Sequence, residues 1–249
     1  MTKRISLSQI RLVHNLRLKK YRDLTHLFVA EGDKCIGDLL PAFEPKLLIN
    51  YDNQQYAHCS VYATDKDIRQ LSSLRTPQGS IGVFLMPDWS ALPPISTHIL
   101  AIDGVQDPGN LGTILRTCDW FGIYHVVCST HTVDCFSPKV VQATMGSLAR
   151  VQVHYTHLPQ WLQQVENHTA VYGTLLDGDN LLNHHTIPDA SVIIMGNEGN
   201  GISNEVRPFI AHPIRIPSFV DINHLPTDAP ESLNVATATA VILSYFRLH

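Results

Sequence analysis

Short apolar runs alternate with segments of helical periodicity along most of this 249-residue chain. Apolar runs of about four to eight residues are typical of strands, and apolar residues repeated every three to four positions are typical of helices. In the first part, the pattern predicts strands at 27–30, 46–49, 60–63 and 81–86, and helices from Ser6 or Ser8 to about Leu18, at 32–40 and at 65–74. This alternation predicts a small α/β domain.

The second part repeats the pattern. It predicts strands at 98–102, 124–128, 150–153, 170–175, 192–195 and 213–216, and helices at 110–121, 137–148, 158–165, 203–209 and from about residue 232 to the end. Strands that are apolar on both faces are typical of a parallel sheet covered on both sides. We therefore expect a larger parallel-sheet α/β domain here.

A proline-rich stretch separates the two parts. Residues 87–97 contain three prolines and no periodicity, which is typical of a linker. The predicted division is a domain at 1–90, a linker at 91–97 and a domain at 98–249.

Composition narrows the class of protein. With 44% hydrophobic and 16% charged residues, the chain has the balance of a folded soluble protein. No apolar run approaches the roughly 20 residues that span a bilayer, and the N-terminus lacks a signal-peptide pattern, so we expect a cytoplasmic protein without a membrane segment. Five cysteines without a C-x-x-C pair fit buried, reduced thiols. No His or Cys spacing matches a metal site, so no metal is expected.

Charge is distributed unevenly along a chain whose formal net charge is −4. Seven cations precede the first acid, Asp23: Lys3, Arg4, Arg11, Arg17, Lys19, Lys20 and Arg22. Such a cluster is either a solvated helix face or a surface that contacts phosphates.

Two loops after predicted strands have an unusual composition. One runs from Asp107 to Gly112 and leads into a helix that carries Arg116; the other, 196–201, has glycine at three of its six positions around Glu198. Glycine permits close backbone approaches at an entropic cost, so a ligand cradle is a better interpretation than a plain turn. The loop after Asp103 lacks G-x-G-x-x-G and a Walker motif, which argues against a dinucleotide-dependent oxidoreductase.

These blocks, taken in order, resemble the signature motifs of the SpoU-type RNA ribose methyltransferases of the trefoil-knotted class. The first block extends from Asp107 through Thr117, the second is 196–203, and the third joins Ile216-Pro217 to 232–235. Residues 19–22 and 28–32 also resemble the family's small substrate-binding domain. The resemblance covers nearly the whole chain.

The resemblance implies methylation of an RNA ribose 2′-hydroxyl, with S-adenosylmethionine as the methyl donor and a homodimer as the assembly. It also implies a knot in the domain at 98–249 and RNA binding by the domain at 1–90. The RNA-binding candidates are Arg11, Arg17, Lys19, Lys20 and Arg22. Transfer RNA and ribosomal RNA both remain open as substrates, because such contacts follow shape and phosphates.

The family assigns activation of the ribose hydroxyl to the arginine that corresponds to Arg116. A guanidinium has a pKa above about 12 and is a poor base, so we expect Arg116 to orient a ribose or phosphate and to stabilise developing negative charge. The alternative is an arginine that is merely paired with a carboxylate.

The other catalytic candidates match polar positions of the three motifs: Asn110, Glu198, Ser232 and Asn234. We expect Asn110 and Glu198 to fix Arg116 and the loops, whereas Ser232 and Asn234 also fit ordinary helix capping. The resemblance places the donor's adenine among Thr174, Gly196, Ile216 and Leu233.

The chain departs from the family in its third motif. Residues 218–231 make the connection several residues longer and add three acids, and Ala236 replaces the commoner serine. We expect the longer connection to act as a lid or a substrate selector. A second hypothesis is an RNA-binding protein whose methyltransferase-like domain no longer catalyses; the complete set of polar motif residues favours the enzyme.

Overall fold

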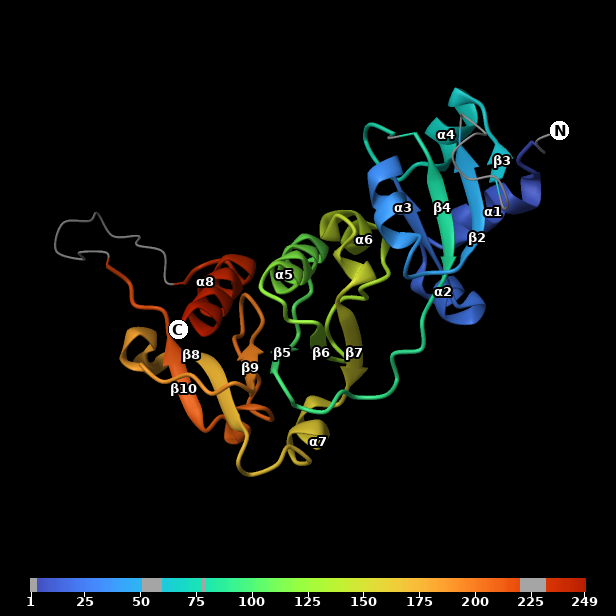
Figure 1. The fold of residues 1–249 in the computed structure, drawn as a ribbon. Coiled ribbons are helices and arrows are strands. Elements are labelled where there is room, and N and C mark those ends of the chain that lie inside the picture. The colour runs from blue at the N-terminus through green and yellow to red at the C-terminus, as the bar shows by residue number, and fades with distance from the viewer. Residues whose placement is uncertain (1–3, 51–59, 78, 220–231) are drawn as a thin grey trace. The chain divides into compact units, whose positions relative to one another are not determined.

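A computed structural model describes residues 4–50, 60–77, 79–219 and 232–249 of this chain (Figure 1). The chain forms two compact units. The first consists of Met1–Asp88 and Asp134–Arg150, and the second of Trp89–Val133 and Val151–His249.

The first unit contains a four-stranded mixed sheet in the order β1-β4-β2-β3. Its strands are β1 (Leu27–Glu31), β2 (Pro45–Asn50), β3 (Ser60–Tyr62) and β4 (Ile81–Leu85). β4 pairs antiparallel with β1 and β2, and β2 pairs parallel with β3. All four lie where the apolar runs predict them.

The helices of the first unit are α1 (Leu7–Asn15), α2 (Lys19–Thr25), α3 (Asp33–Leu39), α4 (Asp65–Leu71), α6 (Pro138–Thr144) and the 3-10 turn η1 (Ser147–Ala149). Ser6 begins α1 with a reciprocal capping box to Gln9. The predicted helix to Leu18 is wrong at its end: α1 stops at Asn15, and Leu18 is extended before α2 begins. The pattern did not predict α2.

The predicted division places 134–150 in the second domain, whereas the packing puts this segment in the first unit. Arg22 Nε donates to Asp134 Oδ2 at 3.0 Å, and the rings of Phe28 and Phe136 lie 4.8 Å apart. Partners more than 100 residues apart leave no periodic signal in the sequence, which is why the pattern missed this segment.

A tight turn ends α6 earlier than the predicted 137–148 helix. Met145 and Gly146 both have positive φ, at 52° and 90°. A Cβ at Gly146 would lie 2.5 Å from Asp38 Cβ, so no side chain fits there. The helix therefore breaks because the chain must pass close to α3.

Gly146→Ala is expected to destabilise the protein by about 2–4 kcal/mol, because it adds both a left-handed backbone penalty and a clash. Gly37→Ala is the matched control, since a Cβ at this exposed position within α3 meets nothing within 4 Å. The control should be neutral or stabilising by up to about 1 kcal/mol. Urea denaturation of both variants measures the difference, and equal stabilities would contradict the prediction.

The second unit contains a six-stranded sheet in the order β10-β8-β9-β5-β6-β7, with every neighbouring pair parallel. Its strands are β5 (His98–Ile102), β6 (His125–Ser129), β7 (Gln152–Thr156), β8 (Ala170–Asn180), β9 (Ser191–Met195) and β10 (His212–Arg215). The predicted parallel sheet is confirmed. β7 begins two residues later than expected, and β8 continues beyond residue 175.

Helices and short turns cover this sheet. They are α5 (Pro108–Trp120), α7 (Leu158–Leu162), α8 (Val235–Leu248), η2 (Leu181–Asn183) and η3 (Arg207–Phe209). α5 and α8 pack side by side (Figure 1). Ile99 and Ala101 belong to one core cluster, and Leu100 and Ile102, which alternate with them along the strand, are also fully buried, so both faces of β5 are covered. The predicted 203–209 helix is reduced to η3.

Two other sequence expectations concern the chain as a whole. Within the described ranges, no helix is both long and apolar enough to cross a membrane. Cys35, Cys118, Cys128 and Cys135 are buried, and none of them forms a disulfide with another residue in the described part of the chain. Burial raises the pKa of the Cys35 thiol to about 11, which keeps it protonated and unreactive at neutral pH.

Candidate functional site

The ends of β5 and β9 bring the first two motifs together. Ile102 pairs with Met195, and the next residue, Asp103, donates its backbone N–H to the carbonyl of Met195 at 2.9 Å. Asn197 Nδ2 donates to the carbonyl of Gly104 at 2.7 Å. The two predicted loops are therefore neighbours at the carboxyl edge of the parallel sheet, where α/β sheets bind ligands.

The glycine-rich loop closes on itself. Asn197 and Gly201 exchange backbone hydrogen bonds of 2.9 and 3.0 Å, and Asn197 Oδ1 accepts from the N–H groups of Gly199 and Asn200. Gly196 is packed so closely that a Cβ would lie 2.3 Å from the carbonyl carbon of Gly201. The loop needs glycine at 196 because backbone, not a flexible side chain, occupies the space.

A chain of side-chain hydrogen bonds joins all three motifs. Asn110, in the first turn of α5, donates its Nδ2 to Glu198 Oε1 at 2.7 Å. Asn234, the N-cap of α8, donates its Nδ2 to Asn110 Oδ1 at 2.9 Å. Three of the five predicted catalytic residues thus meet although 124 positions separate Asn110 from Asn234.

The N-cap of α8 fixes the orientation of the two amide groups in this series of hydrogen bonds. Asn234 Oδ1 accepts from the N–H groups of Ala236 and Thr237, so its amide nitrogen must face Asn110. The nitrogen of Asn110 then faces Glu198, because its oxygen is already engaged. The Asn234 side chain therefore both caps α8 and contacts the first motif, and the carboxylate of Glu198 receives a donor from Asn110.

Arg116 lies outside this hydrogen-bonded chain. It is exposed on α5, and helix geometry places it about 9 Å along the axis and about 120° around it from Asn110. Among the residues that the structure describes, none pairs with its guanidinium. The alternative of an arginine paired with a carboxylate is therefore not observed there, and the catalytic role of Arg116 stays a prediction.

Three of the four predicted cofactor residues lie in or just after three neighbouring strands, β8, β9 and β10. Thr174 is half-buried in β8, and its Oγ1 donates to the carbonyl of Ile194 at 3.3 Å. Gly196 follows β9, and half-buried Ile216 follows β10. Leu233 is 52% exposed just before α8, next to exposed Ser232. The placement of the adenine among these four residues stays a prediction.

The predicted lid falls mostly on residues about which the structure gives no description. Of the connection at 218–231, only Ser218 and Phe219 are described, and both are exposed. Its proposed role stays a prediction.

Four of the five predicted RNA-binding residues are exposed in the first unit: Arg11, Arg17, Lys19 and Lys20. Arg17 also donates to the carbonyls of Leu71 and Ser72 at the end of α4, and Lys19 pairs with Asp23. The prediction for Arg22 is wrong: its side chain is 3% exposed, pairs with Asp134 and donates to the carbonyls of Leu16 and Arg17. A guanidinium so enclosed cannot reach a phosphate.

The prediction gave no role to two residues that hold the site together. Asp107 caps α5 by accepting the N–H of Asn110 at 2.8 Å, and Asn197 braces both loops. Asp107 carries a sequence signal, because an acid before Pro at the first helical position is a typical N-cap. Nothing in the sequence identifies the partner of Asn197.

Comparison with known proteins identifies the family that the three motifs resemble. Residues 97–244 match the SpoU rRNA Methylase family. A TrmH-family protein from Porphyromonas gingivalis is 38% identical, with a TM-score of 0.87 over 98% of both chains. An AdoMet-bound rRNA methyltransferase from Sinorhizobium meliloti is 28% identical, with a TM-score of 0.86 over 100% of this chain and 98% of its own.

A curated relative has similar length. The 23S rRNA (guanosine(2553)-2′-O)-methyltransferase of Bacillus subtilis is 29% identical over 243 residues, which is 93% of each chain. The three motifs are joined at one edge of the sheet, and the family match covers more than half of the chain. This chain therefore belongs to the SpoU rRNA methylase family.

Proposed function

We propose that this chain is an RNA methyltransferase that transfers a methyl group from S-adenosylmethionine to a ribose 2′-hydroxyl of ribosomal RNA. The observation that carries the proposal is the hydrogen-bonded chain Asn234–Asn110–Glu198, which joins the three motifs. Full-length similarity to a 23S rRNA 2′-O-methyltransferase supports ribosomal rather than transfer RNA.

The residues have separate roles in this proposal. The methyl donor supplies an already activated methyl group, so the protein contributes mainly positioning. Glu198, held by Asn110, and Ser232 at the start of α8 bind and orient polar groups of the substrates. Arg116 orients the ribose or its phosphate and stabilises negative charge that develops on the 2′-oxygen.

Calorimetric titration with S-adenosylmethionine is the first test. We expect micromolar binding near one per subunit, with Gly196, Ile216, Leu233 and Thr174 around the adenine. Transfer of labelled methyl to 23S, 16S and transfer RNA, followed by alkaline hydrolysis, then identifies a 2′-O-methylated nucleotide. Donor binding without transfer to any RNA would favour the alternative of a non-catalytic RNA-binding protein.

The exposed cations of α1 and α2 are proposed to contact RNA phosphates. Arg11 is exposed on α1, and Lys20 Nζ lies 4.9 Å from the centroid of the Tyr21 ring. Arg11→Glu with Lys20→Glu should weaken RNA binding and reduce the slope of log K against log salt by about 1 per lost contact. Lys34→Glu with Lys66→Glu, at exposed positions of α3 and α4, is the charge-matched control. Equal slopes for both pairs would leave the α1–α2 cations as a solvated face.

A homodimer is proposed to form on the exposed face of α5 and α8. Trp120 is 85% exposed, Leu248 74% and Tyr124 54%, and all three line one shallow hollow. Arg116 lies four residues before Trp120, so both lie on the same face of α5 and the catalytic arginine borders this surface. Exposed apolar clusters of this kind mark protein interfaces.

Trp120→Glu should convert the dimer to a monomer, because it buries a charge in an apolar interface. Sedimentation velocity measures the assembly, and Leu24→Glu is the control, since Leu24 is 75% exposed in the other unit. A dimer that survives Trp120→Glu would exclude this surface.

We also propose a trefoil knot in the second unit, because of the order in which its strands and helices pack. β10 lies at the edge of the sheet beside β8, whereas α8 packs on α5 and Asn234 bonds to Asn110 near β5. The chain therefore returns to the centre of the sheet after reaching its edge. The similarity to TrmH-family structures over the whole chain supports the same topology.

A further inference from the structure

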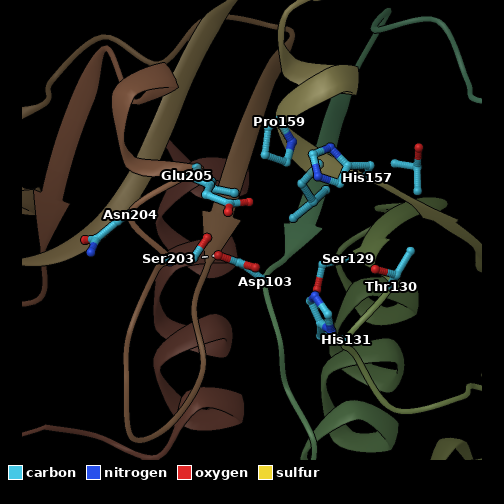
Figure 2. Close-up of a pocket in the computed structure, with 12 residues that line it drawn as sticks. Asp103, Ser129, Thr130, His131, His157, Pro159, Ser203, Asn204 and Glu205 are labelled. Carbon is cyan, nitrogen blue, oxygen red and sulfur yellow. Dashed lines mark hydrogen bonds between the residues drawn. The ribbon is translucent and has the colours of Figure 1, made fainter.

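A cavity opens at the same edge of the parallel sheet. It measures about 340 Å³ and lies where β5, β6 and β7 end, at Asp103, Ser129 and Thr156 (Figure 2). Residues 203–206, which follow the glycine-rich loop, border it on one side. None of the predicted catalytic or cofactor residues lines it, yet β5 lies directly beside β9, so the cavity begins about 5–10 Å from the strand end that carries Gly196.

The charges of this cavity select against a phosphate. Two carboxylates, Asp103 and Glu205, line it, and no lysine or arginine among the described residues does. Asp103 is buried, and its Oδ2 accepts the N–H of Ser203 at 2.8 Å, which aims the carboxylate and leaves Oδ1 available (Figure 2). A buried carboxylate requires hydrogen-bond donors, so the ligand must present N–H or O–H groups.

The walls of the cavity favour a flat ring. His157 and Pro159 lie together on one side and His131 lies with Ser129 on another (Figure 2). Unstacked RNA bases are bound by stacking on aromatic side chains, including histidine, and by hydrogen bonds to their edges. A volume of about 340 Å³ is at the small end of ligand pockets and suits one base.

Among the bases, guanine matches a carboxylate best. Its Watson–Crick edge carries two adjacent donors, the N1–H and the 2-amino group, which a single carboxylate can accept together. In Asp103, Oδ1 accepts one of them, and the second lone pair of Oδ2, beside the Ser203 N–H, accepts the other. Adenine and cytosine offer one amino group beside an acceptor, and uracil offers one N–H between two acceptors, so each would bring an acceptor toward Asp103. A metal ion is a poorer occupant, because the described residues contain no group of three or more possible ligands.

We propose that this cavity binds an unstacked guanine base of the RNA substrate, with Asp103 accepting from its Watson–Crick edge and His157 stacking on the ring. The proposal rests on the proposed function, because it assigns part of the RNA to a pocket beside the methyl-donor loops.

The test uses free nucleosides and the intact protein labelled with ¹³C-histidine. Guanosine should shift the ring resonances of His131 and His157, assigned with His131→Gln and His157→Gln. Adenosine, cytidine and uridine should not shift them. Inosine, which lacks the 2-amino group, should bind at least about tenfold more weakly than guanosine.

Asp103→Asn is the decisive variant, because its amide oxygen still accepts the Ser203 N–H while its nitrogen turns a donor toward the base. Guanosine binding should fall at least about tenfold, and Asp189→Asn, at an exposed position away from the cavity, should leave it unchanged. Unchanged binding of S-adenosylmethionine by Asp103→Asn verifies that the loops remain folded.

The outcomes separate this proposal from the proposed function. Donor binding and RNA methylation without any guanosine effect at His131 or His157 would overturn the guanine site alone. Guanosine binding without methylation of any RNA would support the site and overturn the enzyme. Equal responses to all four nucleosides, or a response to MgCl₂ but not to guanosine, would also overturn it.

Discussion

Arg116→Ala is expected to reduce methyl transfer by at least about 10²–10³-fold while leaving the affinity for S-adenosylmethionine and the fold largely unchanged. The guanidinium is exposed and has no partner among the described residues, so its removal breaks no contact of the native structure there. The loss should appear in kcat rather than in donor binding, because the arginine acts on the ribose oxygen. Single-turnover transfer of labelled methyl, with parallel calorimetry, measures both quantities.

Arg215→Ala is the matched control, since Arg215 is also exposed but lies at the end of β10. Arg116→Lys distinguishes charge from geometry: a guanidinium that positions two oxygens at once is not replaced by an ammonium, so activity should remain low. Full activity in Arg116→Ala would refute the assigned role.

Gly196→Ala is expected to weaken donor binding by at least about tenfold and to lower stability by about 1–3 kcal/mol. The added Cβ would lie 2.3 Å from the carbonyl carbon of Gly201 and 2.4 Å from the nitrogen of Ile202. Because both are backbone atoms, the loop itself must move. Calorimetry with S-adenosylmethionine and thermal denaturation measure the two effects.

Gly199→Ala, three residues along the same loop, is the control. A Cβ there would meet only Asn197 Oδ1 at 3.6 Å, and the N–H that bonds to Asn197 is retained. Donor affinity and melting temperature should change little. Wild-type donor binding by Gly196→Ala would show that this close approach is not part of the cofactor site.

Repeated apolar runs were enough to predict the strands of both sheets and the parallel character of the second. The sequence could not locate the ends of elements that depend on distant partners. α6 stops at Thr144 because Gly146 passes against Asp38, and β8 continues to Asn180 where β10 pairs with it. Neither contact leaves a local pattern.

In the candidate site, too, the local sequence pattern predicted some features, whereas contacts between distant residues decided others. Ordered motifs around Asn110, Glu198 and Asn234 indicated one site, since glycine loops and polar residues after apolar strands are readable locally. The buried position of Arg22 is not predictable from the sequence, because a cation within a basic cluster has the same local pattern whether it faces solvent or Asp134. The sequence pattern also does not indicate the cavity at Asp103, because its walls come from four separate segments.

The sequence by itself determined the α/β class, the parallel sheet, the family and most of the polar residues of the site, because these follow from local periodicity and from short motifs. The tertiary structure alone decided that segment 134–150 packs with the first unit and that Asn234 orients Asn110 toward Glu198. It also decided that Arg116 lies on an exposed face with Trp120. These depend on contacts between residues far apart in the chain, where the free energy of packing, not local preference, selects the partner.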